Sequence, residues 1–230
     1  MALILNLETA TSVCSVSLSE EGKTLALKEN LQSRSHAESL TLLIEEVMRI
    51  SGITLQEIKA VAVSMGPGSY TGLRIGVSTA KGLCLALDAA LIGINTLQIM
   101  ARQVSEAYNK SSNLPLLFCP MIDARRMEIY TACYDLLNNE ISPAAAVIVD
   151  ADTFKERLKE NILVFFGDGA EKCKALYSLE PNAVFIDAIF PSAAQMGALS
   201  AVAFGNSEFV DVAYFEPFYL KDFYSPPAKE

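Results

Sequence analysis

The glycine-rich run GPGSYTGLRIG, from Gly66 to Gly76, constrains the fold of this 230-residue chain more than any other feature of its sequence. It follows an apolar stretch, Ala60 to Ser64, that reads as a buried strand, and it opens a helix predicted over Thr71 to Leu87. Two glycines around a proline make a tight turn whose backbone can approach another group closely. The run therefore predicts an α/β protein with a close-packed or anion-binding turn between this strand and this helix.

The run differs from the phosphate-binding and nucleophile loops that it first suggests. No Gly-Lys-Ser/Thr follows it, as a P-loop requires, and the spacing of Gly68 and Gly72 departs from GxGxxG. Ser69 directly follows Gly68, so the run is not the G-x-S-x-G turn of hydrolases either. Two interpretations stay open. The glycines serve packing alone, or the first N–H groups of the helix bind an anion.

The helix that follows the run is apolar nearly all round, with Arg74 and Lys81 as its only charged residues. A stripe of small residues recurs along it at every fourth position: Gly72, Gly76, Ala80 and Cys84. Small residues at this spacing let another helix pack closely. Such a helix lies either in a core or in an interface with another protein.

The preceding helix, predicted from Ser35 to Ile50, opens with the capping-box pair Ser35 and Glu38 and has a similar apolar excess. A partner protein could cover both helices, or a sheet and the other helix could do so within the chain. From the first alternative we predict a partner interface that draws on both helices. Its residues are Leu40, Leu43, Ile44, Val47, Gly72, Leu73, Gly76, Val77, Ala80, Leu83 and Cys84.

The two halves of the chain share one plan. An apolar strand ends at Glu8 and is followed by a small polar turn and an alternating strand, and the same order recurs around Asp123. This similarity favours a duplicated β-β-β-α-β-α unit, although two such strand pairs also arise by chance in α/β chains. The linker candidate, residues 109–115 (NKSSNLP), places the lobes at 1–108 and 109–230. We expect the last helix and tail to pack back on the first lobe.

Acidic residues end the first strand of each half, where an actin-like ATPase holds its catalytic or Mg²⁺-binding carboxylates. The first hairpin, ETATSVCS, contains no glycine, so we predict at most a vestigial nucleotide site. Its residues are Glu8, Thr9, Asp123, Gly167 and Gly169. His36 is the only histidine and no CxxC pair is present, so we expect no metal site and no tightly bound cofactor. At the start of its helix, His36 reads as a surface or hinge residue.

The composition bears on partners and compartment. The net charge is −9 and the pI about 4.7, and the basic residues are scattered along the sequence. We therefore do not expect the chain to bind nucleic acid by itself. Five cysteines without a CxxC pair suit a reducing compartment. No apolar stretch approaches the roughly 18–20 residues of a membrane span. These features predict a cytoplasmic protein without membrane contact.

Five segments occur in the order that they have in a known family: ILNLETAT (4–11), SHAESL (35–40), GPGSYTGLRIG (66–76), DARRMEIY (123–130) and PFYL (217–220). The pattern resembles the TsaB (YeaZ) family along essentially the whole chain, and the glycine-rich element is specific to that family and its paralogue TsaD. The resemblance implies an actin-like ATPase (ASKHA, ribonuclease H-like) fold of two related lobes. It also implies a role in forming threonylcarbamoyladenosine beside the tRNA anticodon.

The same resemblance implies a non-catalytic subunit that supports TsaD and pairs with it through the first two helices. The ATPase TsaE belongs to that complex, ATP and Mg²⁺ are expected on the partner subunits, tRNA contact is indirect, and the chain alone forms a homodimer. Glu8 stands where the family usually has aspartate, and the histidine pair of the TsaD metal site is reduced here to His36. The alternative function is an actin-like ATPase or small-molecule kinase that uses Glu8 and Asp123; a protease lacks a nucleophile or metal constellation.

Overall fold

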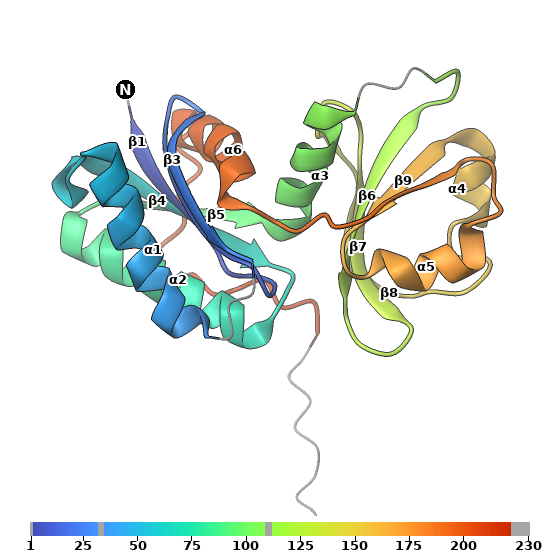
Figure 1. Ribbon diagram of the computed structural model, residues 1–230, viewed down its shortest axis with the longest axis horizontal. Coiled ribbons are helices and arrows are strands. Elements are labelled where there is room, and N and C mark those ends of the chain that lie inside the picture. The colour runs from blue at the N-terminus through green and yellow to red at the C-terminus, as the bar shows by residue number, and fades with distance from the viewer. Residues whose placement is uncertain (1, 32–34, 109–111, 222–230) are drawn as a thin grey trace, which may run out of the picture.

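The computed structural model describes residues 2–31, 35–108 and 112–221. They form two lobes, each built on a five-stranded sheet (Figure 1). The first sheet has the order β3-β2-β1-β4-β5, in which β1, β2 and β3 are antiparallel and β1, β4 and β5 are parallel. Its strands are β1 (Leu3–Glu8), β2 (Cys14–Glu20), β3 (Lys23–Asn30), β4 (Ile58–Gly66) and β5 (Ala90–Asn95).

The second sheet repeats this topology, because its order β10-β9-β6-β7-β8 matches the first strand for strand. Its strands are β6 (Leu116–Asp123), β7 (Glu128–Tyr134), β8 (Glu140–Ile148), β9 (Ile162–Phe166) and β10 (Ala183–Ile186). The α-helices are α1 (His36–Ser51), α2 (Tyr70–Leu87), α3 (Thr96–Ala107), α4 (Lys155–Glu160), α5 (Ala170–Tyr177) and α6 (Ala193–Gly205), and a 3₁₀ turn covers Leu55–Glu57. Each half thus runs β-β-β-α-β-α-β-α, which confirms the predicted duplication.

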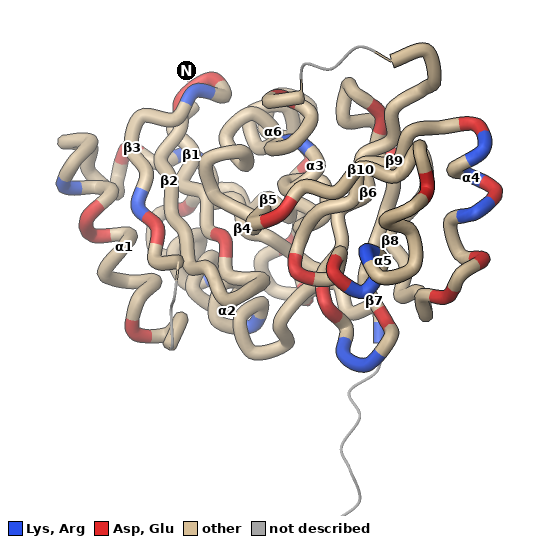
Figure 2. The backbone as a smooth tube through the Cα atoms, turned by 45° about the vertical axis from the view of Figure 1, so that its right-hand side comes forward, with Lys and Arg blue, Asp and Glu red and all other residues tan. Residues whose placement is uncertain are grey.

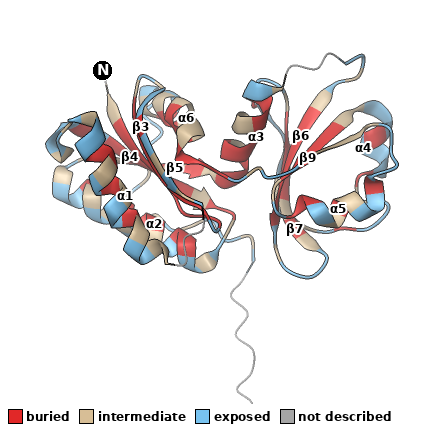
Figure 3. Cartoon of the chain, in the orientation of Figure 1, coloured by how far each residue is buried: buried red, intermediate tan, exposed pale blue. Residues whose placement is uncertain are grey.

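Local sequence signals set the ends of the helices in the first lobe. Ser35 caps α1 by accepting a hydrogen bond from the Glu38 N–H, and Gly52 ends the helix in a left-handed conformation at φ +70°. The residues of β4 alternate little and are nearly all buried, as expected of a central parallel strand with helices on both faces. Figure 3 shows the strands as the buried centre of each lobe.

The last helix of each half packs mainly on the sheet of the other half. The helix α3 buries apolar side chains against β6, β7 and β9, whereas α6 buries its own against β1, β4 and β5. Both helices therefore lie toward the middle of the molecule, and α1 and α2 cover the outer face of the first sheet (Figure 1). Packing thus assigns α3 to the second sheet, although it precedes the predicted boundary at residue 108. Residues 109–111 of the predicted linker lie outside the described residues.

The chain after α6 returns along the first lobe. Val210 forms an isolated antiparallel bridge with Leu91 on the edge strand β5. Farther on, the Lys81 ammonium donates hydrogen bonds to the carbonyl oxygens of Ala213 (3.0 Å) and Phe215 (3.1 Å). The tail segment, residues 206–221, therefore runs beside α2. None of the described helices combines the length and the apolar character that a bilayer span needs.

Candidate functional site

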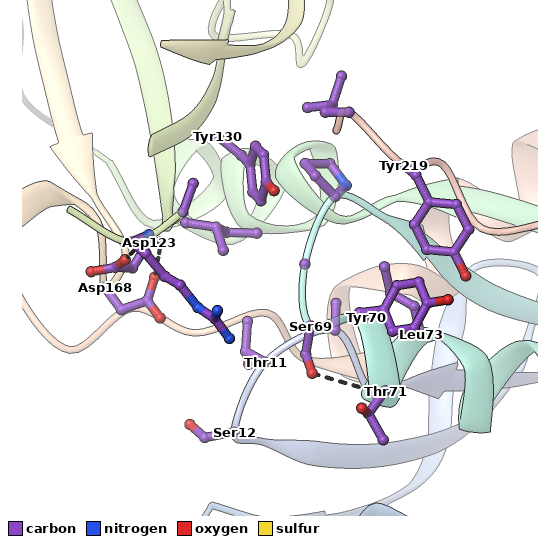
Figure 4. A pocket seen from close by; sticks show the side chains of 18 of the residues that line it. Thr11, Ser12, Ser69, Tyr70, Thr71, Leu73, Asp123, Tyr130, Asp168 and Tyr219 are labelled. Atoms are coloured by element: carbon purple, nitrogen blue, oxygen red, sulfur yellow. Dashed lines mark hydrogen bonds between the residues drawn. The ribbon is translucent and has the colours of Figure 1, made fainter. Parts of the chain in front are cut away.

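A cleft of about 1350 Å³ opens between the two lobes. The first lobe contributes the turn after β1 and the N-terminal ends of α1 and α2, and the second contributes the β6–β7 turn and the loop after β9. The end of the tail segment lies along its mouth. Figure 4 shows hydroxyl groups on one side, Thr11, Ser12, Ser69 and Thr71, and carboxylates on the other, Asp123 and Asp168.

The glycine-rich run packs directly on the turn that follows β1. A Cβ atom on Gly72 would collide with the Thr9 carbonyl oxygen, and a Cβ atom on Gly76 would collide with the Thr9 hydroxyl. The Ser69 N–H donates to the Ala10 carbonyl oxygen at 2.6 Å, and the Ser69 hydroxyl accepts from the Gly72 N–H at 3.2 Å. Two of the first N–H groups of α2 are therefore satisfied within the protein. The geometry favours the packing interpretation of the run over anion binding.

Glu8 lies fully buried beneath this turn and does not line the cleft. Its Oε1 atom accepts hydrogen bonds from the Ala10 N–H (2.6 Å) and the Ser64 hydroxyl (3.0 Å). Burial raises the pKa of Glu8 to about 7, although these hydrogen bonds oppose the rise. The neighbouring Thr9 is equally buried and donates its hydroxyl hydrogen to the Gly72 carbonyl oxygen at 2.8 Å. Both residues hold the turn in place.

Asp123, the second predicted carboxylate, does line the cleft. Its Oδ1 atom lies 2.9 Å from the Lys172 ammonium and accepts a 2.6 Å hydrogen bond from the Arg125 N–H. Burial raises the pKa of Asp123, but the bond from Lys172 and the bond from Arg125 outweigh this effect and bring it below its usual value. Asp168, which is not among the predicted site residues, accepts a hydrogen bond from the Asp123 N–H at 2.9 Å. Burial raises the Asp168 pKa.

The structure therefore does not gather the predicted nucleotide residues around one point. Glu8 and Thr9 lie under the first turn, and Asp123 lies at the cleft wall. Gly167 and Gly169 flank Asp168 and pack against the end of β6, where the Gly169 N–H donates to the Met121 carbonyl oxygen at 3.1 Å. In this Gly-Asp-Gly turn the aspartate, Asp168, lines the cleft, and the two glycines allow the close packing.

His36 forms part of the cleft wall and ties two segments together. Its Nε2 atom donates a 2.7 Å hydrogen bond to the Thr11 carbonyl oxygen, which fixes the start of α1 to the turn after β1. The side chain is half-buried, not at the free surface that the sequence suggested. Within the described ranges, no three histidine, cysteine or acidic residues are grouped so that they could hold a metal ion.

The PFYL segment lies where the tail crosses the mouth of the cleft. Tyr219 packs on Tyr70, with ring centroids 5.2 Å apart, and its hydroxyl accepts a 3.2 Å hydrogen bond from Arg74 Nε. The Arg74 guanidinium also lies 4.3 Å from the Tyr70 ring centroid, a cation–π distance. Lys221 forms an ion pair with Glu128 of the second lobe. The tail thus contacts both lobes, α2 in the first and β7 in the second, a role that no periodicity in the sequence indicated.

Nine of the eleven residues predicted for the partner interface are buried within the first lobe, so they pack inside the chain. These residues are Leu40, Ile44, Val47, Gly72, Leu73, Gly76, Val77, Ala80 and Cys84. The stripe of small residues faces inward, toward the turn at Thr9, since this close approach needs glycine. Leu43 and Leu83 are half-buried. An interface made by the helix pair itself stays a prediction.

A second stripe of small residues faces outward on the same helix. Ser78, Gly82 and Ala86 are exposed at every fourth position, and a Cβ atom on Gly82 would meet no described atom within 4 Å. Two leucines of the helix pair are also exposed: Leu85, about one turn after Gly82 on α2, and Leu42 on α1. These five residues are called the outer helix face below.

Comparison with known proteins identifies clear relatives. The family model described as TsaD, tRNA N6-adenosine threonylcarbamoyltransferase, matches residues 29–164. The chain is 32% identical to the Escherichia coli (strain K12) tRNA threonylcarbamoyladenosine biosynthesis protein TsaB over 95% of this chain and 94% of that protein. It is 35% identical to the Haemophilus influenzae protein of the same name over 55% of this chain and 51% of that protein. The solved structure of YeaZ from Pseudomonas aeruginosa superimposes with a TM-score of 0.79 at 25% identity, over 96% of this chain and all of that one.

Proposed function

The chain belongs to the TsaB (YeaZ) family and has its two-lobed actin-like fold, and on this premise we propose that it is a non-catalytic subunit for tRNA modification. Its relatives are named for the biosynthesis of threonylcarbamoyladenosine. In this proposal it supports a TsaD-type transferase in modifying the adenosine beside the tRNA anticodon. TsaE joins through the complex, and ATP and Mg²⁺ bind to those partner subunits.

The arrangement of the cleft supports a subunit without chemistry of its own. A working phosphotransfer site needs carboxylates that are free to orient Mg²⁺ and backbone N–H groups that are open to phosphate. Here the Glu8 carboxylate accepts hydrogen bonds from its own turn, and the Ala10 carbonyl oxygen takes the Ser69 N–H. Asp123 is held by Lys172. The Glu8 Oε1 atom, the Ala10 carbonyl oxygen and Asp123 already have partners within the chain, so they stabilise the fold, whereas Glu8 Oε2 is buried without a hydrogen-bond partner.

The outer helix face is the observation that carries the proposal. Leu85 is 76% exposed and lies beside Gly82, where the helix surface is flat and open to solvent. Small residues at four-residue spacing, flanked by leucines, suit close packing of a partner helix. The helices α1 and α2 lie side by side on the outside of the first lobe, so a partner could reach both (Figure 1). The same face would pair two copies of the chain when no partner is present.

The distribution of charge supports indirect contact with tRNA. The net charge is −9, and Figure 2 shows basic residues spread around the molecule instead of gathered on one face. Arg74 and Lys81 are engaged with the tail segment. Strong binding to a phosphate backbone needs several basic side chains on one surface. In this proposal the partner subunits therefore supply most of the contact with tRNA.

Co-expression with the TsaD-type protein of the same organism tests the docking surface. We expect Leu85→Glu to abolish the heterodimer, measured as mass by light scattering, because it places a charge in an apolar interface. Leu137→Glu is the matched control, since Leu137 is 79% exposed but lies in the second lobe. Full assembly of the Leu85→Glu protein, with both variants folded by circular dichroism, would contradict the proposal.

A second candidate function rests on the size of the cleft. A cavity of about 1350 Å³ lined by Asp123, Asp168 and the exposed Arg125 and Arg126 can hold a nucleotide. This is the feature that an actin-like ATPase or small-molecule kinase would use. Calorimetry of the isolated chain with Mg²⁺-ATP separates the two functions. Micromolar binding that is lost in Asp123→Asn would favour the enzyme, whereas no heat of binding would favour the subunit.

A further inference from the structure

Two cysteines face each other across neighbouring strands in the second lobe. The antiparallel register of β6 and β7 pairs Phe118 with Tyr134 and Met121 with Thr131, so Cys119 lies directly opposite Cys133. Their sulfur atoms are 3.5 Å apart. Directly opposed residues in an antiparallel pair have Cα atoms about 4.5–5.5 Å apart, within the range that a disulfide spans. This pair can be bridged without moving the sheet.

A cation touches one sulfur of this pair. The Arg157 guanidinium on α4 donates a hydrogen bond to the Cys133 sulfur at 2.8 Å and another to the Ser142 hydroxyl at 3.0 Å. Cys133 is 2% exposed and lies just beneath the exposed Arg157. The hydrogen bond with Cys119, helped by those of Ser142 and Arg157, lowers the pKa of Cys133 to about 6 despite burial. The pKa of Cys119 is raised well above its usual value by the hydrogen bond to Cys133 and by burial.

The other three cysteines of the chain have no such surroundings. Burial raises the pKa to about 11 for Cys14 and Cys84, and to about 12 for Cys173, so each remains a neutral thiol. The Cys173 thiol donates to the Met121 sulfur at 3.4 Å, in the same core as the pair. In the described part of the chain, no three histidine, cysteine or acidic residues are grouped so that they could hold a metal ion. The cation at its sulfur sets Cys133 apart from the other cysteines.

We propose that Cys119 and Cys133 are an oxidation site at which hydrogen peroxide forms a reversible intramolecular disulfide, with Arg157 as the positioning residue for the reacting sulfur. The Cys133 thiolate attacks one peroxide oxygen, which forms an S–O bond and breaks the O–O bond, and the departing hydroxide takes a proton to become water. Cys119 then attacks the Cys133 sulfenic acid. The S–S bond forms, hydroxide leaves, and it takes the Cys119 proton to give a second water.

The disulfide would join the two strands whose connecting turn lines the interlobe cleft. The strand β6 ends at Asp123 and β7 begins at Glu128, and both residues belong to the cleft wall. A covalent link between these strands restricts their relative movement at the base of the turn. The site is independent of the helix pair proposed for partner docking, so either proposal can fail without the other.

Mass mapping of the full-length chain tests the site directly. The reduced protein is treated with equimolar hydrogen peroxide, its remaining thiols are alkylated, and it is digested with trypsin. Cys119 and Cys133 fall in different tryptic peptides, 111–125 and 127–155. We expect these two peptides to become disulfide-linked while the other three thiols stay alkylated, and dithiothreitol to restore both peptides. Oxidation at another cysteine first, or oxidation of Cys133 without the cross-link, would overturn the proposal.

Surface variants isolate the role of Arg157. At pH 7 Arg157→Gln should slow disulfide formation about tenfold, because the thiolate fraction of Cys133 falls, and Arg157→Lys should restore much of the rate. Lys159→Gln is the matched control, since it removes the same charge from α4 at a side chain that pairs with Glu156 instead. Equal rates for Arg157→Gln and Lys159→Gln, in proteins with unchanged melting temperatures, would contradict the assignment.

Discussion

Ser200 on α6 donates a 2.7 Å hydrogen bond to the Oδ1 atom of Asn6 on β1, although 194 residues separate the two in the chain. The Asn6 amide in turn donates to the hydroxyls of Ser17 (3.2 Å) and Ser19 (3.0 Å) on β2. All four side chains are buried. The last helix is therefore fixed on the first sheet by directional polar contacts in addition to apolar packing, which sets its position along the strands.

The contact between these residues predicts a specific loss of stability. Ser200→Ala leaves a buried acceptor on Asn6 without this donor, so the free energy of unfolding should fall by about 1–3 kcal/mol. Urea denaturation measures the change. Ser78→Ala is the control, because it makes the same substitution in a helix at an exposed position. Equal effects of the two variants would contradict the role of the hydrogen bond.

Two glycines on α2 should respond oppositely to alanine. In Gly76→Ala the new methyl group meets the Thr9 hydroxyl, and we expect a loss of about 1–3 kcal/mol from overpacking. In Gly82→Ala the methyl group points into open space, and the better helix propensity should stabilise the protein by up to about 1 kcal/mol. Thermal unfolding of both variants gives the comparison. A stable Gly76→Ala protein would show that the turn at Thr9 can move away.

The tail should loosen when its contact with α2 is removed. Arg74→Ala takes away both the hydrogen bond to the Tyr219 hydroxyl and the cation over the Tyr70 ring. Hydrogen exchange of the backbone N–H groups in residues 215–221 should accelerate, while exchange in β1 and β4 stays unchanged. Arg49→Ala, at the exposed end of α1, serves as the control. Unchanged exchange in the tail would contradict this role of Arg74 and would mean that the backbone contacts of the tail alone hold it on α2.

The raised pKa of Glu8 predicts how stability depends on pH. Because burial raises the folded-state pKa from 4.5 to about 7, the folded protein binds this proton more tightly than the unfolded chain does. The contribution is complete below pH 4.5 and is lost as pH rises through 7. Between pH 4.5 and 8 the unfolding free energy of the native protein should therefore fall by about 3 kcal/mol relative to that of Glu8→Gln. Urea denaturation at each pH measures this change. The same pH dependence of the unfolding free energy in both proteins would contradict this pKa.

The sequence predicted the repeated topology well because strand patterns and helix caps are local. The first strands of the halves, which end at Glu8 and Asp123, carry the same apolar-to-acidic pattern, and Ser35 and Gly52 mark the ends of α1. The duplicated unit implies a third strand in the second half, but local pattern does not locate β8, because its sequence EISPAAAVI contains a proline and an alanine run with weak strand preference. The helix α4 begins only at Lys155, because Asp150 and Thr153 form a hydrogen-bonded turn before it.

The candidate site could be predicted only in part, because orientation is a tertiary property. Two interleaved stripes of small residues occur on α2, and spacing alone does not tell which of them, that of Gly76 or that of Gly82, faces the core. The carboxylates Glu8 and Asp123 have equivalent places in the two repeats, yet one is buried and the other lines the cleft. The tail has no periodicity to show where it packs.

The exchange of the last helices between the sheets sets an order of events during translation. The inner face of the first sheet, with Ile4, Ala60 and Ile92, is covered by Met196 and its neighbours on α6. A ribosome must therefore synthesise residues 193–205 before the first lobe can complete its core. Until then the nascent first half presents an uncovered apolar sheet, a surface of the kind that makes folding intermediates prone to aggregation.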